Sequence, residues 1–371
     1  MSEVHPQAHR IPKTESVIEN SPLLERSPRE SRLEKFYLFS SDLELREEYS
    51  NFFGGLRIGK LLEDLDLVAG KVAYSHTQGW ERKLSIYTAA CDRIDLIGAL
   101  PNTSDLRLLA SVNWVGRSSL EVGVKILSGT ENQWKRVARA FFIMVSRRDG
   151  LASEVNSLNL ETQEEQRRFK EGQKRQNLRR EMSLHHILNV APSEKESDLL
   201  HDLFLKIRQG SISGVIMEKT LRQSTRLMHP QFRNIHNKIF GGYLMRESFE
   251  LAWNITYLYC QQRPHFLCVD HMYFFKPVEI GSILSFTGQV IYTSAKALMV
   301  EVTAEVIEPV TGISDITNIS YYTFSARNEA GDSLKITPII PKTYEEGLKY
   351  LDGSKRFQMG EEARRYSNEK K

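Results

Sequence analysis

The residues whose types and spacing are best suited to chemistry lie in the stretch 234–253, which reads NIHNKIFGGYLMRESFELAW. Asn234 stands in a short polar loop, and Phe240, Gly241 and Gly242 lead directly into a pattern typical of a helix. Two glycines before a helix allow close packing, or let a ligand approach the unpaired backbone N–H groups at the helix start. These N–H groups carry about half a positive charge, so they suit a carbonyl oxygen that becomes an oxyanion.

The same arrangement occurs earlier in the chain. Asn51 lies eight residues before Gly59, which is the spacing between Asn234 and Gly242, and a helical pattern follows both glycines. Later features also correspond, Asp92 with Asp270 and the stretch 114–122 with 292–300. An internal duplication of this kind predicts two similar units that face each other as the subunits of a homodimer do.

The elements around the two motifs have the same order. In the first block, 45–150, a helix over KLLEDLDLVAGKVAY precedes strand-like stretches at 84–90, 106–115, 120–127 and 137–145. In the second block, 211–330, a helix reaching about residue 259 precedes strand-like stretches at 224–228 (before its loop), 266–275, 283–292, 297–306 and 319–326. One long helix with several antiparallel strands, twice, predicts an α+β fold of two domains.

The remaining segments are polar. We expect residues 1–44 to form a disordered arm, 151–210 a charged and mostly solvated helical linker, and 331–371 an extension lying over the second domain. Net charge is +3, from 50 basic and 47 acidic residues, which does not favour nucleic acid as a partner. Three cysteines without a CxxC pair indicate a reducing compartment and no metal site, and no apolar run is long enough for an integral membrane segment.

Several of these stretches resemble a known family. NxxNxIFGG, VDHMYFFKPVEIGSIL and the YTSxxxxVEV strand are similar to the acyl-coenzyme A thioesterases of the hotdog superfamily. RIGKLLEDLDLVAG, NWVGRSSLEV and KTYEEGLKYLDG resemble the mitochondrial double-hotdog branch known as thioesterases nine and ten. Over about residues 45–353, the resemblance implies two tandem hotdog domains, each a helix wrapped by an antiparallel sheet. It also implies hydrolysis of fatty acyl-CoA to free acid and CoA, without a further cofactor.

The resemblance also implies where the catalytic carboxylate lies, namely seven residues after the second glycine. That position is Asp66 in the first domain and Phe249 in the second, where Glu250 follows one place later and points in a different direction. Because paired hotdogs build their site between the two units, we expect one competent site. We expect it to contain Asp66 as base or nucleophile, Gly242 as oxyanion donor and Asn234 as orienting amide. We expect the reciprocal site, with Asn51, Gly59 and Glu250, to be weak.

Substrate contacts are predicted for Phe240 and Gly241, and for two basic residues at corresponding positions of the two halves, Arg117 and Lys296. Related double hotdogs indicate a homo-oligomer, a trimer of chains, located in the mitochondrion, whereas the acidic residues of the N-terminal arm favour the cytoplasm. Alternatives from the residues remain. Asp66 could be a surface residue, Asn234 and His236 could simply shape a turn, and the chain could bind acyl-CoA without hydrolysing it. A hydratase is disfavoured, because no histidine follows either glycine at a suitable spacing.

Overall fold

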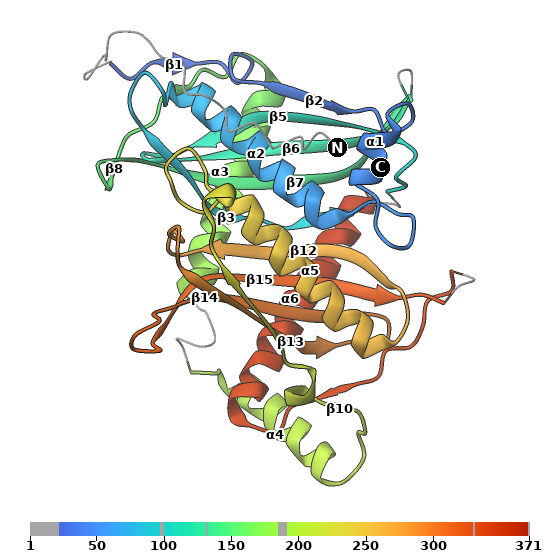
Figure 1. The fold of residues 1–371 in the computed structure, drawn as a ribbon. Coiled ribbons are helices and arrows are strands. Elements are labelled where there is room, and N and C mark those ends of the chain that lie inside the picture. The colour runs from blue at the N-terminus through green and yellow to red at the C-terminus, as the bar shows by residue number, and fades with distance from the viewer. Residues whose placement is uncertain (1–21, 97–99, 131–132, 185–190, 329–330, 370–371) are drawn as a thin grey trace.

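The computed structural model describes residues 22–96, 100–130, 133–184, 191–328 and 331–369. At its centre two long helices, α2 (Ile58–Thr77) and α5 (Gly241–Cys260), lie side by side on one face of a large sheet (Figure 1). No helix within these described ranges is long and apolar enough to cross a membrane.

Both central helices form as their apolar patterns predict, and they run in opposite directions. The residues of α2 that face the sheet and α5 are buried, among them Leu61, Leu62, Leu65, Val68 and Ala69. The direction follows from the glycines, because a Cβ atom at Gly59 would lie 3.3 Å from Phe249, while one at Gly241 would lie 3.1 Å from Asp66. The start of each helix therefore meets the middle of the other.

One antiparallel sheet of twelve strands runs through both halves of the described chain. The first half contributes, in spatial order, β2 (Leu33–Tyr37), β5 (Asp105–Val115), β6 (Ser119–Thr130), β7 (Gln133–Arg148) and β3 (Ser85–Cys91). The second half repeats that order with β11 (Arg222–Leu227), β13 (Ile283–Thr293), β14 (Leu298–Ile307), β15 (Ser314–Ala326) and β12 (Pro264–Phe274). The halves join where β12 pairs with β3, and β4 (Ile94–Leu96) and β8 (Leu151–Ala152) pair beside this path. The strands expected in both blocks are present.

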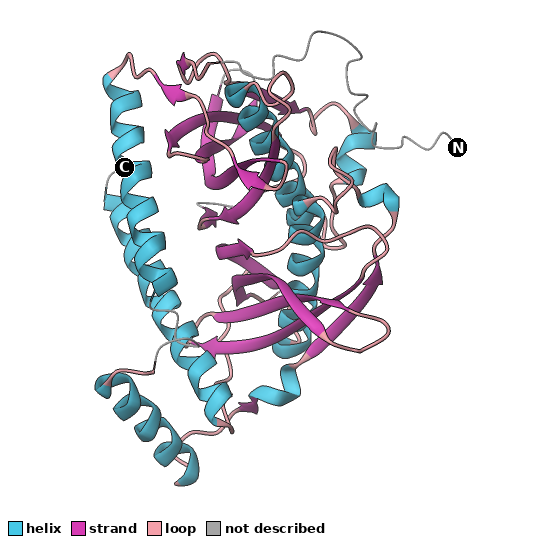
Figure 2. Ribbon diagram, turned by 90° about the vertical axis from the view of Figure 1, so that its left-hand side faces the viewer, coloured by secondary structure: helices cyan, strands magenta, loops and turns pink. Residues whose placement is uncertain are grey.

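Two further long helices, α3 (Gln163–Leu184) and α6 (Tyr344–Glu369), lie on the opposite face of the sheet from α2 and α5 (Figure 2). Both begin with the same cap. The Glu165 carboxylate accepts hydrogen bonds from the N–H groups of Glu161 and Thr162, and the Thr162 hydroxyl accepts one from the Glu165 N–H. Thr343 and Glu346 repeat this arrangement at the start of α6. Such reciprocal caps satisfy the unpaired N–H groups at a helix start.

The contacts of these outer helices with the sheet are repeated too. The Arg175 guanidinium lies 3.8 Å from the ring centroid of Phe141, and that of Arg356 lies 3.9 Å from the ring of Tyr321. Each repeat is therefore a central helix, an antiparallel sheet and an outer helix. The expectation of a solvated linker helix is wrong for α3, because part of it packs against β5 and pairs with buried carboxylates. Composition alone did not show this, because arginines that pair with the sheet look the same in sequence as solvated ones.

The expected arm is also wrong for the part of it that the structure describes, since residues 1–21 lie outside the described ranges. β2 pairs with β5, and Tyr37 and Phe39 are fully buried. Because β2 has only five residues and its Phe36 is exposed, its period-two pattern is too short to be recognised. The domain boundaries themselves stay a prediction. The short elements are β1 (Glu25–Arg26), α1 (Leu43–Glu48), β9 (Ser157–Leu158), α4 (Glu194–Arg208), β10 (Val215–Ile216), η1 (Met217–Thr220), η2 (Pro230–Phe232) and β16 (Ile339–Ile340).

Candidate active site

Asp66 lies between the two repeats and is only 2% exposed. It projects from the inner face of α2 toward the start of α5, so it is not the surface residue that its spacing alone allowed. Its Oδ1 atom accepts a 2.6 Å hydrogen bond from the Thr88 hydroxyl on β3. A second hydrogen bond comes from the backbone N–H of Gly242 in the first turn of α5. The carboxylate is thus held by both halves of the chain.

Burial raises the pKa of Asp66 to about 6, above its ordinary value of 3.8. The hydrogen bonds from Thr88 and Gly242 act in the opposite direction, because they stabilise the charged form, and the nearby Glu63 raises the pKa slightly further. A carboxylate with a pKa of about 6 is mostly ionised at neutral pH and is more basic than an exposed aspartate. Such a group can take a proton from water or attack a carbonyl carbon.

The two glycines of α5 are needed for this approach. A Cβ atom at Gly242 would lie 2.7 Å from the backbone oxygen of Glu63, and one at Gly241 would lie 3.1 Å from the Asp66 Oδ2 atom. Any side chain at Gly242 would push the helices apart and move Asp66 away from the N–H groups of α5. The backbone N–H of Gly242, expected to bind the oxyanion, donates to Asp66 in this structure.

The loop before α5 crosses α2 beyond Asp66. The side-chain oxygen of Asn234 accepts hydrogen bonds from the N–H groups of His236 (2.8 Å) and Lys238 (3.2 Å), so it shapes its own loop. His236 reaches the first repeat, where its ring hydrogen-bonds the Tyr74 hydroxyl. Tyr74 is two turns after Asp66 on α2. His236 is therefore part of the interface between the repeats, and the interpretation of it as a simple turn residue is incomplete.

At the reciprocal position, aromatic rings replace the polar pair. Phe249 corresponds to Asp66, and Phe266 on β12 corresponds to Thr88 on β3, since each strand has a bulge directly after that residue. The Phe249 and Phe266 rings pack edge to face with their centroids 5.1 Å apart, and Phe249 is 5% exposed. The hydrogen-bonded carboxylate and hydroxyl of one half are thus two hydrophobic rings in the other.

The other residues expected at the reciprocal site have structural partners. The Asn51 side-chain oxygen accepts from the N–H groups of Phe53 and Gly55, as Asn234 does in its own loop. Gly59 lies against Phe249 instead of a carboxylate. Glu250 forms an ion pair of 2.6 Å with Arg57, which precedes α2. The residue of α5 that lies against Gly59 is therefore a phenylalanine, and the Glu250 carboxylate is held by Arg57 instead.

At the pseudo-twofold axis the two central helices also meet through charge. Glu63 on α2 and Arg246 on α5 occupy corresponding positions of the two repeats, and they form an ion pair of 2.5 Å. In a dimer of identical chains, the same residue would face itself at this point. The duplication has allowed the two copies to acquire opposite charges.

The predicted CoA-binding cations lie in exposed turns. Arg117 stands between β5 and β6, its side chain is 86% exposed, and it pairs with Glu154 at 3.2 Å. Lys296 is exposed in the corresponding turn between β13 and β14. Neither contacts Asp66, Gly241 or Gly242 among the interactions of the described residues. Phe240 is half-buried at the start of α5, where its ring packs beside Gly242.

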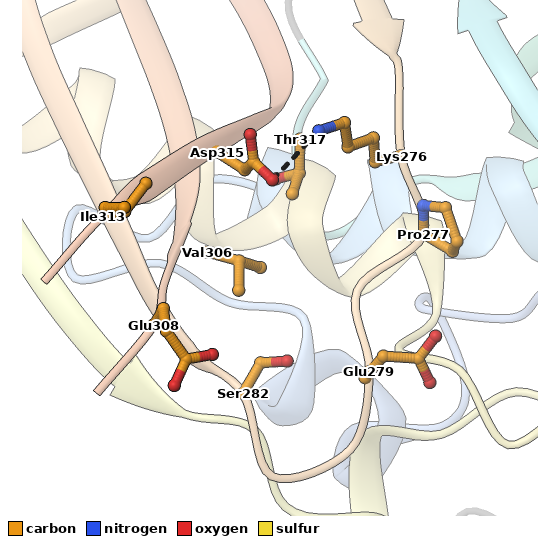
Figure 3. A pocket seen from close by; sticks show the side chains of 9 residues that line it. All are labelled: Lys276, Pro277, Glu279, Ser282, Val306, Glu308, Ile313, Asp315 and Thr317. Carbon is orange, nitrogen blue, oxygen red and sulfur yellow. Dashed lines mark ion pairs between the residues drawn. The ribbon is translucent and has the colours of Figure 1, made fainter. Parts of the chain in front are cut away.

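A surface pocket of about 210 Å³ lies elsewhere, at one end of β13, β14 and β15 (Figure 3). Its rim carries an ion pair of 3.0 Å between Lys276 and Asp315, and it contains none of the residues predicted for the active site. We therefore assign it no part in the chemistry.

Sequence reasoning missed Thr88 and Tyr74. Thr88 could have been found by aligning the sequence of β3 with that of β12. In that alignment Thr88 corresponds to Phe266, just as Asp66 corresponds to Phe249. Tyr74 lies on a helix face that reads as ordinary apolar core, and its hydroxyl contacts His236 and accepts a 3.0 Å hydrogen bond from the Ile86 N–H. No signal in the sequence indicated that path.

Two helices on one face of a continuous antiparallel sheet, related by a pseudo-twofold axis, define a tandem hotdog protein in which the buried Asp66 lies between the two halves. No family model matches the chain. It is 36% identical to acyl-coenzyme A thioesterase 9, mitochondrial, of Mus musculus, across 94% of this chain and 80% of the mouse protein. It is 34% identical to acyl-coenzyme A thioesterase 4, mitochondrial, of Humulus lupulus, across 90% and 67%. The chain belongs to the acyl-coenzyme A thioesterase family.

Among solved structures, an acyl-CoA hydrolase from Staphylococcus aureus covers 42% of this chain and 94% of its own, with 24% identity and a TM-score of 0.40. The family relationship confirms the resemblance seen in the sequence, the tandem hotdog fold and the class of thioester hydrolases. The residues of the site and the compartment stay predictions.

Proposed function

We propose that acyl-CoA is hydrolysed at a single site between the repeats, where Asp66 of α2 faces the first turn of α5. The observation that carries this proposal is the difference between the halves. One half holds a buried carboxylate with two hydrogen-bond donors from Thr88 and Gly242, whereas the other holds Phe249 and Phe266 at the same places. Only the first arrangement offers a group that can accept a proton or form a bond.

In the proposed reaction, the acyl carbonyl binds with its oxygen toward the N–H groups of Gly241 and Gly242. As Asp66 takes up a proton, the Gly242 N–H exchanges its bond to Asp66 for the developing oxyanion. Asp66 takes a proton from a water molecule as the water oxygen bonds to the carbonyl carbon. When the tetrahedral intermediate collapses, the C–S bond breaks, and the proton held by Asp66 passes to the leaving sulfur of CoA. If the carboxylate instead attacks directly, an anhydride forms and water then hydrolyses it, with the same products.

The loop of Asn234 has a supporting part in this proposal. Because its side-chain oxygen accepts hydrogen bonds from its own loop, we propose that its amide nitrogen is the atom that orients a carbonyl or a water. We propose that Phe240 shapes the acyl channel beside Gly242. We propose that the adenosine phosphates of CoA bind away from Asp66 and Thr88, with Arg117 and Lys296 as candidate contacts.

The experiment is a comparison of two carboxylate variants in an assay that follows free thiol release from acyl-CoAs of several chain lengths. Asp66→Ala is expected to abolish release, while Glu250→Gln, which only removes an exposed ion pair with Arg57, is expected to retain it. Full turnover by the Asp66 variant would refute the assignment, and loss of turnover in the Glu250 variant alone would place the site at the other end of the helix pair.

We also propose that the protein is mitochondrial, as the names of its mouse and hop relatives say of those proteins, and that it acts as a trimer of chains. Imaging of a C-terminally tagged protein distinguishes mitochondria from the cytoplasm. Light scattering on the purified full chain measures the assembly.

A further inference from the structure

A second pocket, on the far side of the sheet from Asp66, is strongly cationic. It has a volume of about 310 Å³ and lies between α3, the outer face of β5, β6 and β7, and the turn that precedes β2. Seven arginine and lysine side chains line it, against three glutamates, so the lining has an excess of four positive charges. The seven come from three separate parts of the fold: the turn before β2 (Arg29, Arg32), the sheet (Lys125, Arg139) and α3 (Arg167, Arg168, Arg175).

At the centre of the pocket, two cations lie side by side on adjacent strands of the sheet. Lys125 on β6 and Arg139 on β7 are direct partners in the antiparallel register. Like charges directly opposite each other on a sheet are destabilising. Burial and the neighbouring cations lower the pKa of both side chains, Arg168 acting on Lys125 and Arg136 on Arg139. The arrangement therefore costs stability in the empty protein.

The second repeat shows that the fold does not require this pair. Leu120 begins the equivalent hairpin in the first repeat and Leu298 in the second, and five residues further each strand reaches the position in question. There, Lys125 and Arg139 correspond to Thr303 and Ile319, which are also direct partners. The same sheet, with the same outer helix over it, is built in one copy with an uncharged pair and in the other with two cations.

Internal ion pairs only partly neutralise the pocket. Glu164 accepts from Arg168 and lies 3.7 Å from Lys125, and Glu165 lies 3.7 Å from Arg29 but uses its other oxygen in the cap of α3. Glu171 lies 3.9 Å from Arg167, and Arg175 pairs with the buried Glu121 at 2.6 Å. Among the described residues, none of the ion pairs at this pocket includes Arg32 or Arg139. The cations outnumber their partners, and they converge on one volume.

We propose that this pocket binds a small anion with adjacent phosphate groups, with Lys125 and Arg139 below it and the arginines of α3 above it. Two or three linked phosphates carry about as much negative charge as the lining has in excess positive charge, whereas a single phosphate, at about −2, leaves about half of that excess unmatched. Inorganic polyphosphate, a nucleoside triphosphate and free CoA all present this chemistry. The pocket is separated from Asp66 by the sheet, so its occupancy is independent of the proposed hydrolysis.

The test is calorimetric titration of the full chain with tripolyphosphate, at low and at high ionic strength. The double variant Lys125→Thr and Arg139→Ile, which copies the second repeat, is expected to weaken binding at least about tenfold while leaving thiol release unchanged. A matched variant, Lys195→Ser and Lys206→Ser, removes two exposed cations from α4 and is expected to bind as the unaltered protein does. Because the first variant relieves repulsion between like charges, it is expected to unfold at a higher temperature.

The outcomes decide the proposal. Equal losses in the two double variants would show a general charge effect and overturn it, as would tight binding of orthophosphate alone. If the first double variant does not fold, Arg32→Ser, in the exposed turn before β2, serves instead and is expected to weaken binding several-fold. Parallel titrations with ATP and with CoA show which of them uses this pocket. A ligand does so if the double variant weakens its binding together with that of tripolyphosphate. CoA binding that the Lys125 and Arg139 double variant leaves unchanged is assigned to the catalytic site. A failure of the proposed hydrolysis at Asp66 would not change the result for this pocket.

Discussion

Replacing Asp66 by asparagine is expected to remove activity and to stabilise the protein at the same time. Asp66→Asn keeps the size and shape of the side chain but removes the charge. As a general base, the carboxylate is worth about 10²–10⁴-fold in rate, so thiol release is expected to fall by at least that factor. In the unaltered protein, kcat/KM is expected to decline as the pH falls through about 6, because Asp66 takes up its proton there.

The effect on stability follows from the same pKa. The folded-state value of about 6 lies above the ordinary 3.8, so the folded protein binds the proton more tightly than the unfolded chain does. Ionisation of Asp66 therefore costs stability, which is lost as the pH rises from about 4 to about 6 and stays lost above that range. At 1.36 kcal/mol for each tenfold change, the full cost is about 3 kcal/mol. The asparagine amide, which faces the Gly242 N–H, reduces the gain that the variant realises.

Denaturant unfolding of both proteins at pH 8 and at pH 4 measures this difference. At pH 8 the variant is expected to be more stable, by at most about 3 kcal/mol, and at pH 4 most of that advantage is expected to disappear. A variant that is equally stable or less stable at pH 8 would refute the argument that burying the ionised carboxylate destabilises the folded protein. Retained thiol release would refute its catalytic role separately.

Three other substitutions test the surroundings. Thr88→Val is expected to raise the pH midpoint of activity by about one to two pH units, since a hydrogen bond to a charged group is worth about 1.5–3 kcal/mol, while Thr88→Ser is expected to keep the midpoint. Gly242→Ala is expected to destabilise by about 1–3 kcal/mol because its methyl group would meet backbone, whereas Gly70→Ala, with open space around it in α2, is expected to stabilise by about 1 kcal/mol. Phe249→Asp is expected to cost at least about 3–5 kcal/mol in chemical unfolding, since it removes a buried ring and adds a charge without Asp66's donors.

The architecture was largely predictable because the sequence presents it twice, once in each repeat. Helix periodicity in 58–77 and 241–260 and alternation in the main strands each had a second copy against which to be checked. β2 was missed, because five residues with one exposed phenylalanine give too little pattern. The outer helix α3 was misjudged, since its arginines that bind Glu121 and Asp92 cannot be distinguished by composition from solvated ones.

For the site, spacing within one helix was informative and contacts between helices were not. Asp66 and Gly242 could be selected because the family resemblance implies a carboxylate seven residues after Gly59 or Gly242, and the structure places the two residues in contact. The hydrogen bond from Thr88 joins residues 22 apart in the chain, and the contact of His236 with Tyr74 joins residues 162 apart. Such pairs depend on how α2, β3 and α5 pack together, which a single sequence does not specify.

The ion pair between Glu63 and Arg246 has a consequence for assembly from fragments. If the chain were cut between the repeats, two copies of the first half would bring acid against acid at the axis, and two copies of the second half would bring guanidinium against guanidinium. Only unlike halves would meet with opposite charges there. Fusion into one polypeptide thus allowed the two copies to become complementary, so that neither half can replace the other at the interface between them.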